Sequence, residues 1–296
     1  MLSAECAAEE FSRGAGGDQT VGWNRGLHGH ERRFPWLVAI MSIGIGCAGA
    51  GLLTVDEHSR YLVDGRRSGY TYLSEENQRL QDDDFANPGL LWVERGRELW
   101  RQADGAAATS CASCHGDAAD SMRGVRTRYP RFDPTLGKLI NLEQQINRCR
   151  AERMQAPPYP SESEVLLAMT TFIGTQSRGL PIDVRIDGPA QPFFEAGKAF
   201  FYQRRGQLDM ACAHCHEQYT EQRLRGDVIS QGQTNGFPVY RFTWQTLGSV
   251  HRMFEWCNTS VRAEPYPQGS DEYINIELYM AWRGRGLPVE TPAIRR

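Results

Sequence analysis

The chain has 296 residues, a formal net charge of −3 and 23% charged residues. This weak negative balance argues against a nucleic-acid surface, because binding to phosphates needs an excess of Lys and Arg. The length is sufficient for two domains of ordinary size together with a leader.

The N-terminal part, residues 1–55, is typical of an export leader. A polar, glycine-rich segment precedes Arg32-Arg33, and an uncharged stretch follows from Pro35 to Val55. Ala48-Gly49-Ala50 supplies small residues near the end of that stretch, which indicates a signal peptide cleaved near Ala50. An uncleaved membrane anchor and a twin-arginine signal stay open as alternatives. Each of the three places the rest of the chain outside the cytoplasm.

Residues 56–89 are expected to form a charged N-terminal arm. The segment contains the basic pair Arg66-Arg67 and the acidic run Asp82-Asp83-Asp84. A solvated connection that packs against the following domain and a partner-binding arm are both compatible with this composition.

A first domain is predicted over residues 90–185. A helical period begins at Leu90 and leads into the motif Cys111-Ala112-Ser113-Cys114-His115. The chain then contains several Gly and Pro residues, which indicate loops. A helix is expected from about Lys138 to Arg153, and strand signals are weak throughout.

This domain is predicted to close with an apolar helix over residues 165–173. Ser161 is the expected N-cap, because Glu164 follows three residues later in the pattern of a capping box.

A second domain over residues 186–296 repeats the first. Its motif is Cys212-Ala213-His214-Cys215-His216, and a glycine stands fifteen residues before each motif, at Gly96 and Gly197. Each copy contains one further cysteine, Cys149 or Cys257, and ends in the sequence Arg-Gly-Leu-Pro. The chain therefore contains two copies of one unit of roughly 100 residues.

The C-x-x-C-H pattern predicts covalent attachment of haem. Its two cysteines can each add to a haem vinyl group, and the adjacent histidine can then ligate the iron. One match could be chance or half of a zinc site, but two matches in similar surroundings are specific. We therefore expect a mainly α protein with two tandem cytochrome c-like haem domains, long loops and two haem c groups per chain. The attachment residues are Cys111, Cys114, Cys212 and Cys215, and the proximal ligands are His115 and His216.

The ligand on the other face of each iron decides the chemistry. Methionine would make a high-potential electron carrier, and the candidates are Met154, Met169, Met253 and Met280. None of them matches between the two copies as closely as Cys149 and Cys257, which lie 108 residues apart. We therefore favour ligation by these two cysteines, since a thiolate stabilises ferric iron and lowers its potential.

The stretch from Arg252 to Tyr266 resembles the C-terminal domain of the SoxA family of dihaem cytochromes c. It contains the pattern C-N-x-x-V-R-A-E-P, beginning at Cys257. The stretch from Asp82 to Gly89, with Trp92 and Gly96, is also similar to that family, so the likeness covers roughly residues 70–290. Dihaem peroxidases and ordinary dihaem carriers have two C-x-x-C-H motifs but lack this pattern.

The resemblance implies a function. In this family, which supplies the dihaem subunit of the SoxAX complex, the cysteine matching Cys257 ligates the active-site iron and is found as a persulfide. The resemblance thus implies a periplasmic L-cysteine S-thiosulfotransferase that joins thiosulfate to a cysteine of the carrier protein SoxYZ. The monohaem cytochrome SoxX would form a heterodimer with the chain, and an electron-accepting cytochrome c would receive the electrons. Cys257 is the predicted catalytic residue, and the haem beside Cys149 is expected to be structural or an auxiliary electron store.

Arginine side chains near Cys257 are expected to bind the substrate. Both reactants are anionic at the reacting sulfur, so a guanidinium group should lower their repulsion and can hold a sulfonate through two hydrogen bonds. Arg252 is the preferred candidate. The family often has a basic pair before the phenylalanine that matches Phe254, whereas the second position here is Met253. The other candidates are Arg262, Arg283 and Arg285.

Two other functions stay open from the sequence. A thiosulfate dehydrogenase, which couples two thiosulfates to tetrathionate, also uses a cysteine-ligated haem, and a plain dihaem electron carrier would have both irons saturated. His251 lies close to the critical stretch and is interpreted as a hydrogen-bonded histidine rather than a ligand.

Overall fold

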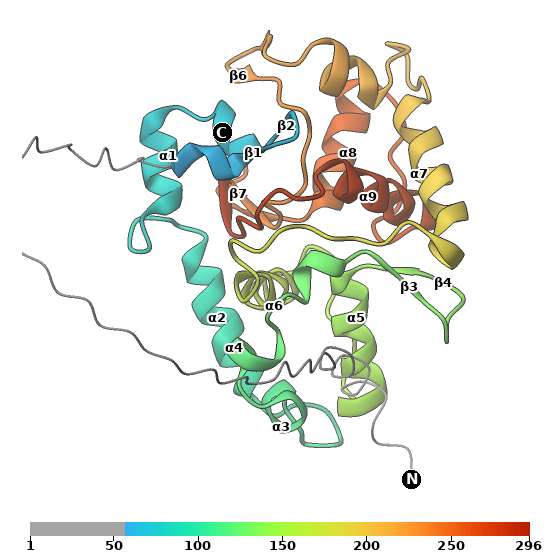
Figure 1. Cartoon of the computed structure of the whole chain (residues 1–296). Coiled ribbons are helices and arrows are strands. Elements are labelled where there is room, and N and C mark those ends of the chain that lie inside the picture. The colour runs from blue at the N-terminus through green and yellow to red at the C-terminus, as the bar shows by residue number, and fades with distance from the viewer. Residues whose placement is uncertain (1–56) are drawn as a thin grey trace, which may run out of the picture. The chain divides into compact units, whose positions relative to one another are not determined.

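Helices dominate residues 57–296, the part of the chain that the computed structural model describes (Figure 1). These residues belong to one compact unit, and the predicted leader over residues 1–55 lies outside the described part. No helix within residues 57–296 is long and apolar enough to cross a membrane.

The arm and the first half of the described chain contain short strands and six α-helices, of which α2 and α6 are the longest, at twelve residues each. The elements, in order, are the 3₁₀ helix η1 (Glu57–Tyr61), β1 (Leu62–Val63), β2 (Arg66–Arg67), the 3₁₀ helix η2 (Gly69–Tyr72), α1 (Glu75–Asp82), α2 (Leu90–Arg101), α3 (Cys111–His115), α4 (Ala118–Ser121), the 3₁₀ helix η3 (Arg126–Arg128), β3 (Arg131–Asp133), β4 (Lys138–Ile140), α5 (Leu142–Cys149), the π-helical turn η4 (Arg150–Met154) and α6 (Glu164–Thr175).

The second half has a similar order of elements. They are the 3₁₀ helix η5 (Gly188–Ala190), α7 (Gln191–Tyr202), the π-helical turn η6 (His214–Gln218), β5 (Arg223–Leu224), β6 (Asp227–Val228), β7 (Val239–Arg241), β8 (Thr246–Gly248), α8 (Val250–Ser260), α9 (Asp271–Arg283) and β9 (Ala293–Arg295).

Two crossed helix pairs organise the fold. Helix α2 packs against α6, and α7 packs against α9, each pair with its own cluster of buried apolar side chains (Figure 1). A Cβ atom on Gly96 would lie 2.5 Å from Phe172 Cβ, and one on Gly197 would lie 2.5 Å from the Asn275 carbonyl carbon. Only glycine lets the helices of each pair approach so closely. This explains why a glycine precedes both motifs at the same distance.

A β-hairpin leads into each helix that contains a candidate ligand cysteine. Strands β3 and β4 pair antiparallel before α5, and β7 and β8 pair antiparallel before α8. The helices are capped by Asn141, which accepts the Gln144 N–H, and by Ser249, which accepts the Arg252 N–H. The helix expected from Lys138 therefore begins only at Leu142, because residues 138–140 are used in strand pairing.

The closing helix of the first half, α6, begins later than expected. Its N-cap is Ser163, whose hydroxyl accepts the Leu166 N–H, and not Ser161. The preceding residue, Glu162, has a left-handed φ of 56° and uses its carboxylate to accept the Ser249 N–H at 3.2 Å. The long-range contact to the start of α8 thus takes Glu162 out of the helix and moves the cap by two residues.

The arm is anchored on the C-terminal segment by a buried polar network. Glu290 is 3% exposed and accepts hydrogen bonds from Ser68, Gln81 and Asn235, and it pairs with Arg295 at 3.2 Å. Helix α1 packs against β9, which joins the β7–β8 hairpin as a parallel strand. The connecting-arm hypothesis placed this segment on the first domain, but its buried contacts are mostly with the end of the chain. A salt bridge between Arg178 and Asp84 adds a contact with the first half.

Candidate active site

His216 is held in the orientation expected of a metal ligand. Its Nδ1 lies 2.8 Å from the Ser230 carbonyl oxygen, so Nδ1 donates and Nε2 is free to ligate. Burial lowers the pKa of His216 and favours the neutral ring, which is the form that binds metals. Gly232, at φ 74°, lies against the imidazole, because a Cβ there would be 2.8 Å from His216 Nδ1. The loop that supplies Ser230 is therefore packed directly on the ring.

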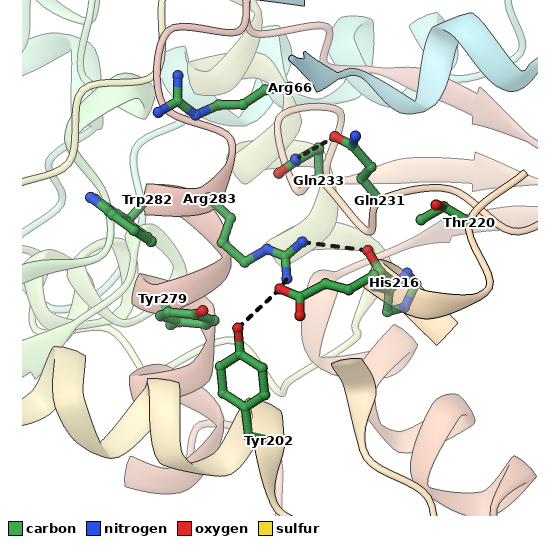
Figure 2. Close-up of a pocket in the computed structure, with 10 residues that line it drawn as sticks. Arg66, Tyr202, His216, Thr220, Gln231, Gln233, Tyr279, Trp282 and Arg283 are labelled. Atoms are coloured by element: carbon green, nitrogen blue, oxygen red, sulfur yellow. Dashed lines mark hydrogen bonds and ion pairs between the residues drawn. The ribbon is translucent and has the colours of Figure 1, made fainter. Parts of the chain in front are cut away.

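The backbone of His216 is held from α9 (Figure 2). Arg283 donates to the Glu217 carboxylate at 3.0 Å and to the His216 carbonyl at 3.4 Å, and its guanidinium lies 4.3 Å above the Phe201 ring. Tyr202 donates to the same carboxylate at 3.1 Å. These groups line a cavity of about 490 Å³. Arg283, one of the predicted candidates for substrate binding, is thus engaged on the side of the motif that positions His216.

The first motif forms its own short helix, α3. Ser110 caps it in a reciprocal capping box with Ser113. The His115 ring lies 5.7 Å from the Trp100 ring, and burial lowers the pKa of His115. Trp100 also donates to the Gly116 carbonyl at 3.0 Å, which ties α2 to the end of the motif.

The fold brings Cys257 close to Cys212 and Cys215, the predicted attachment cysteines of the second motif. Burial raises the pKa of the Cys257 thiol to about 12, and the neighbouring sulfurs of Cys212 and Cys215 act in the same direction. Burial likewise raises the pKa of Cys212 to about 11. A thiol with such a pKa is protonated at neutral pH, whereas coordination to a metal removes the proton. Three sulfurs and an oriented neutral imidazole are a donor set that fits a covalently attached haem with histidine and thiolate ligands.

The methionines considered as ligands divide between the two halves of the chain, and those of the second half lie near its motif. Met280 Cε would be 3.0 Å from a Cβ on Gly232, so Met280 lies beside the loop that packs on His216. Met154 and Met169 are buried at 5% and 2% exposure. Met253 is on α8, one turn before Cys257, and its sulfur is 3.9 Å from Arg241 Nη1.

The residue after each candidate ligand cysteine is tied to the chain just before the haem motif. Arg150, which follows Cys149, pairs with Asp104 at 2.8 Å and lies 3.5 Å above the Tyr159 ring. At the equivalent place in the second half the charges are arranged differently. Asn258 accepts a hydrogen bond from Arg205 at 2.8 Å, and Arg205 lies 4.4 Å above the Tyr266 ring. Asn258 also donates to Tyr273 at 3.3 Å. These bonds position the cysteine helices relative to the motifs.

Each of the other predicted arginines has a partner away from Cys257. Arg252 lies 4.4 Å above the Trp244 ring, with Nη1 3.9 Å from Glu162 and 3.5 Å from the Leu247 carbonyl. Arg262 is exposed at a φ of 58° and contacts Gln207, and Arg285 pairs with Asp183 at 3.3 Å. The role of Arg252 in binding substrate stays a prediction.

Sequence reasoning missed Arg241, the last residue of β7. It is buried at 9% exposure, and burial lowers the pKa of its guanidinium. A negative charge on Cys257 would act in the opposite direction and raise this pKa. Arg241 lies sixteen residues before Cys257, and this separation gives no sign of a contact with α8. The β7–β8 hairpin is what returns the chain towards that helix. An alignment of the two copies on their cysteines would have shown that Arg241 corresponds to Asp133, an exchange of charge at one position.

The interpretation of His251 as a hydrogen-bonded histidine is confirmed. The residue is 2% exposed, its Nδ1 accepts the Gly269 N–H at 3.0 Å, and its Nε2 lies 3.1 Å from Glu277 Oε2. Within residues 57–296 no group of three or more His, Cys, Asp or Glu side chains is arranged to hold a bare metal ion, as a zinc site would need.

Comparison with known proteins gives one consistent relationship. Residues 95–182 match the family model described as SoxA/TsdA, cytochrome c domain. The chain is 44% identical over 229 residues to the L-cysteine S-thiosulfotransferase subunit SoxA of Rhodovulum sulfidophilum, which covers 77% of this chain and 80% of that protein. It is 46% identical over 230 residues to the subunit of the same name from Pseudaminobacter salicylatoxidans, again covering 77% and 80%. The crystal structure of SoxXA from P. pantotrophus superposes with a TM-score of 0.76 at 41% identity, over 78% of this chain and 87% of that one.

Proposed function

Because the chain belongs to the SoxA family, we propose that it is an L-cysteine S-thiosulfotransferase, which conjugates thiosulfate oxidatively to a cysteine of the SoxYZ carrier protein. The observation that supports this most directly is the convergence of Cys257 with Cys212 and Cys215, next to the oriented ring of His216. A haem iron bound beside this thiol, which burial otherwise keeps protonated, would keep it ionised.

The reaction joins two sulfur atoms and releases two electrons. A carrier thiol and thiosulfate give the thiosulfonate-bearing carrier, one proton and two electrons, as the bond between the carrier sulfur and the outer sulfur of thiosulfate forms. Haem c, when bound at the second motif, would supply the centre that accepts these electrons singly. The electrons would then pass to the partner cytochrome and to an accepting cytochrome c.

The residues of this chain bind and orient the reactants. Cys257 supplies the sulfur at the site, and the bonds of Asn258 to Arg205 and Tyr273 hold its helix against the motif. The Nδ1 bond of His216 to Ser230 fixes the ring that lies in the same site. A persulfide on Cys257 would extend this side chain by one sulfur atom.

Two haem c groups in tandem cytochrome c-like domains, residues 90–185 and 186–296, are part of the proposal. The repeated crossing of α2 with α6 and of α7 with α9, each with a glycine at the contact, supports two equivalent binding units. In the first unit Cys111 and Cys114 would attach haem, with His115 and Cys149 as ligands. The superposed complex from P. pantotrophus contains SoxX and SoxA, which supports SoxX as the heterodimer partner. A periplasmic location is also part of the proposal, and the leader-like sequence of residues 1–55 is its support.

Mass spectrometry and spectroscopy of the purified holoprotein test the assignment. The intact mass should show two haems, and a persulfide would add one sulfur at Cys257. Electron paramagnetic resonance of the ferric protein should give thiolate-type low-spin signals, whereas a methionine ligand gives a different g-tensor.

A Cys257→Ala variant should lose thiosulfate-dependent conjugation to the carrier while it retains both covalent haems. Full activity in this variant would refute the proposal. Tetrathionate formed without any carrier protein would instead indicate a thiosulfate dehydrogenase, a function that the names of the curated relatives do not favour.

A further inference from the structure

The surroundings of the two candidate ligand cysteines differ in charge, although their backbones correspond. Asp133 ends β3 and Arg241 ends β7, and each lies sixteen residues before its cysteine, Cys149 or Cys257. The hairpin that follows each residue leads directly into the cysteine helix. The two positions can therefore be compared as equivalents within one molecule.

Around Cys149 the sulfur and the nearby carboxylate each have a side-chain partner. Asp133 is 4% exposed and accepts hydrogen bonds from Thr135 and from the Leu136 N–H, and it pairs with Arg148 of α5. Gln145, one turn before the cysteine, donates to Cys149 Sγ at 3.3 Å. The sulfur thus has a neutral donor, and the nearby carboxylate has a cation.

At the corresponding positions around Cys257, the Nε and Nη1 atoms of Arg241 have no oxygen partner among residues 57–296. Arg241 is 9% exposed, and its Nε has no hydrogen-bond partner among the described residues. Among residues 57–296, the hydrogen-bond contact of its Nη1 is with the Met253 sulfur, at 3.9 Å. Met253 occupies the position that corresponds to Gln145, so no side-chain amide takes the place beside the Cys257 sulfur.

Two indole rings hold the Arg241 guanidinium in place. Its carbon lies 5.3 Å from the Trp244 ring centre and 5.2 Å from the Trp256 ring centre. Trp256 is 42% exposed and is adjacent to Cys257 in the chain, so it forms the outer wall of the site. The carboxylate of Asp227 lies on the other side, 3.6 Å from Nη2, and is 42% exposed, where water screens it.

A buried guanidinium with an unpaired N–H is costly unless an acceptor is present for part of the working cycle. Because residues four apart lie on one face of a helix, the contact with Met253 directs Nη1 towards the face of α8 that contains Cys257. An anion bound there would gain charge-assisted hydrogen bonds in surroundings that are largely closed to water. Thiosulfate has a sulfonate group of suitable charge and geometry at one end and the reactive sulfur at the other.

We propose that Arg241 is the substrate-binding cation of this protein, and that it holds the sulfonate of thiosulfate while the outer sulfur lies beside Cys257. The inference rests on the proposed function and makes it more specific. It assigns to strand β7 the role that the sequence placed on Arg252 of α8. It also explains why thiosulfate would react at the second unit and not at the first, where Arg148 neutralises Asp133.

The test is steady-state kinetics of the holoprotein in complex with its monohaem partner. Arg241→Met should raise the KM for thiosulfate by about ten- to a hundredfold, as expected for loss of a charged hydrogen bond. The KM for the carrier protein should stay unchanged. Arg241→Lys keeps the charge but loses the planar guanidinium group. Its KM for thiosulfate should lie between those of Arg241→Met and the unmodified protein. Arg148→Met, the same chemical change in the equivalent surroundings of Cys149, is the matched control and should leave the thiosulfate KM within twofold.

Sodium sulfate provides a probe that cannot react. At an ionic strength held constant with sodium chloride, sulfate should inhibit the unmodified protein competitively with thiosulfate, and the inhibition constant should rise about tenfold in Arg241→Lys. This measurement does not depend on whether Arg241→Met folds.

Three results would overturn the inference. They are a thiosulfate KM within twofold of normal in Arg241→Met, an absence of competitive inhibition by sulfate, and a large effect confined to Arg252→Met. A changed midpoint potential of the second haem with an unchanged KM would show that Arg241 serves the haem and would also overturn it. Failure of the proposed function is distinguishable, because it would appear as retained conjugation in Cys257→Ala.

Discussion

Replacing Gly197 by alanine tests the helix crossing that supports the second unit. The obstructing atoms are backbone, since the new Cβ would lie 2.5 Å from the Asn275 carbonyl carbon and 3.1 Å from the Ile276 nitrogen. No change of rotamer can relieve this overlap. Helix α7 must therefore move away from α9.

The magnitude follows from two opposing terms. Alanine gains about 1 kcal/mol over glycine in helix propensity. Restoring an ordinary carbon–carbon contact needs a separation of about 1 Å, over which packed side chains lose a quarter to a half of their dispersion attraction. Overpacking of this kind costs about 1–3 kcal/mol. Because the obstruction is backbone, we expect the upper end of that range, a net loss of about 2 kcal/mol and a Tm lower by about 4–8 °C.

Thermal unfolding of the ferric holoprotein, followed by far-ultraviolet circular dichroism and by haem absorbance, measures this change. Gly174→Ala in α6 is the control, because the nearest atoms to its Cβ would belong to the Thr291 side chain and not to backbone, with the methyl carbon at 3.2 Å. That variant should unfold within about 2 °C of the unmodified protein. If Gly197→Ala unfolded at the normal temperature or above, close backbone contact between α7 and α9 would not be the reason for glycine at this position.

Two further predictions concern the surroundings of α8. Asn258→Ala removes the acceptor of the 2.8 Å hydrogen bond from Arg205. It should lower the free energy of unfolding by about 1.5–3 kcal/mol and broaden the thiolate-type resonance of the second haem. Unchanged unfolding and spectra would contradict the role of Asn258 in positioning α8. Burial raises the pKa of Glu143 to about 7, so the folded state keeps a proton that the unfolded state releases at lower pH. Stability should therefore fall by up to about 3 kcal/mol between pH 5 and 8. Glu143→Gln should remove most of this fall in denaturant titrations, and an equally steep fall in the variant would assign it to other groups.

The two units share a backbone arrangement but differ in the polar side chains near Cys149 and Cys257. At the first site Gln145 donates to the Cys149 sulfur and Arg148 pairs with Asp133, in keeping with the proposed structural or electron-storing haem. Met253 and Arg241 occupy the corresponding places at the second site, where the guanidinium has an unpaired N–H. The two sites therefore differ in a few side chains, while the order of hairpin and helix is the same.

The repeat and the haem motifs could be predicted from the sequence because they depend on local spacing. Attachment of haem needs two cysteines and a histidine within five residues, so the bonding pattern is written in adjacent positions. The glycine fifteen residues before each motif was also visible as a repeat, although its purpose was not. The expected N-cap at Ser161 was wrong because a distant group, the Ser249 N–H, withdraws Glu162 from the helix.

By itself, the sequence determined two things: the duplicated C-x-x-C-H motif, which predicts covalent haem attachment, and the correspondence of Cys149 in the first copy with Cys257 in the second. Only the tertiary structure showed that Arg241 contacts Met253 and Trp256 of α8 and that the arm is anchored on Glu290. The residues of a local motif are close in space because they are close along the chain. The position of Arg241 depends on a hairpin that folds back onto α8, and no local period of the sequence records that approach.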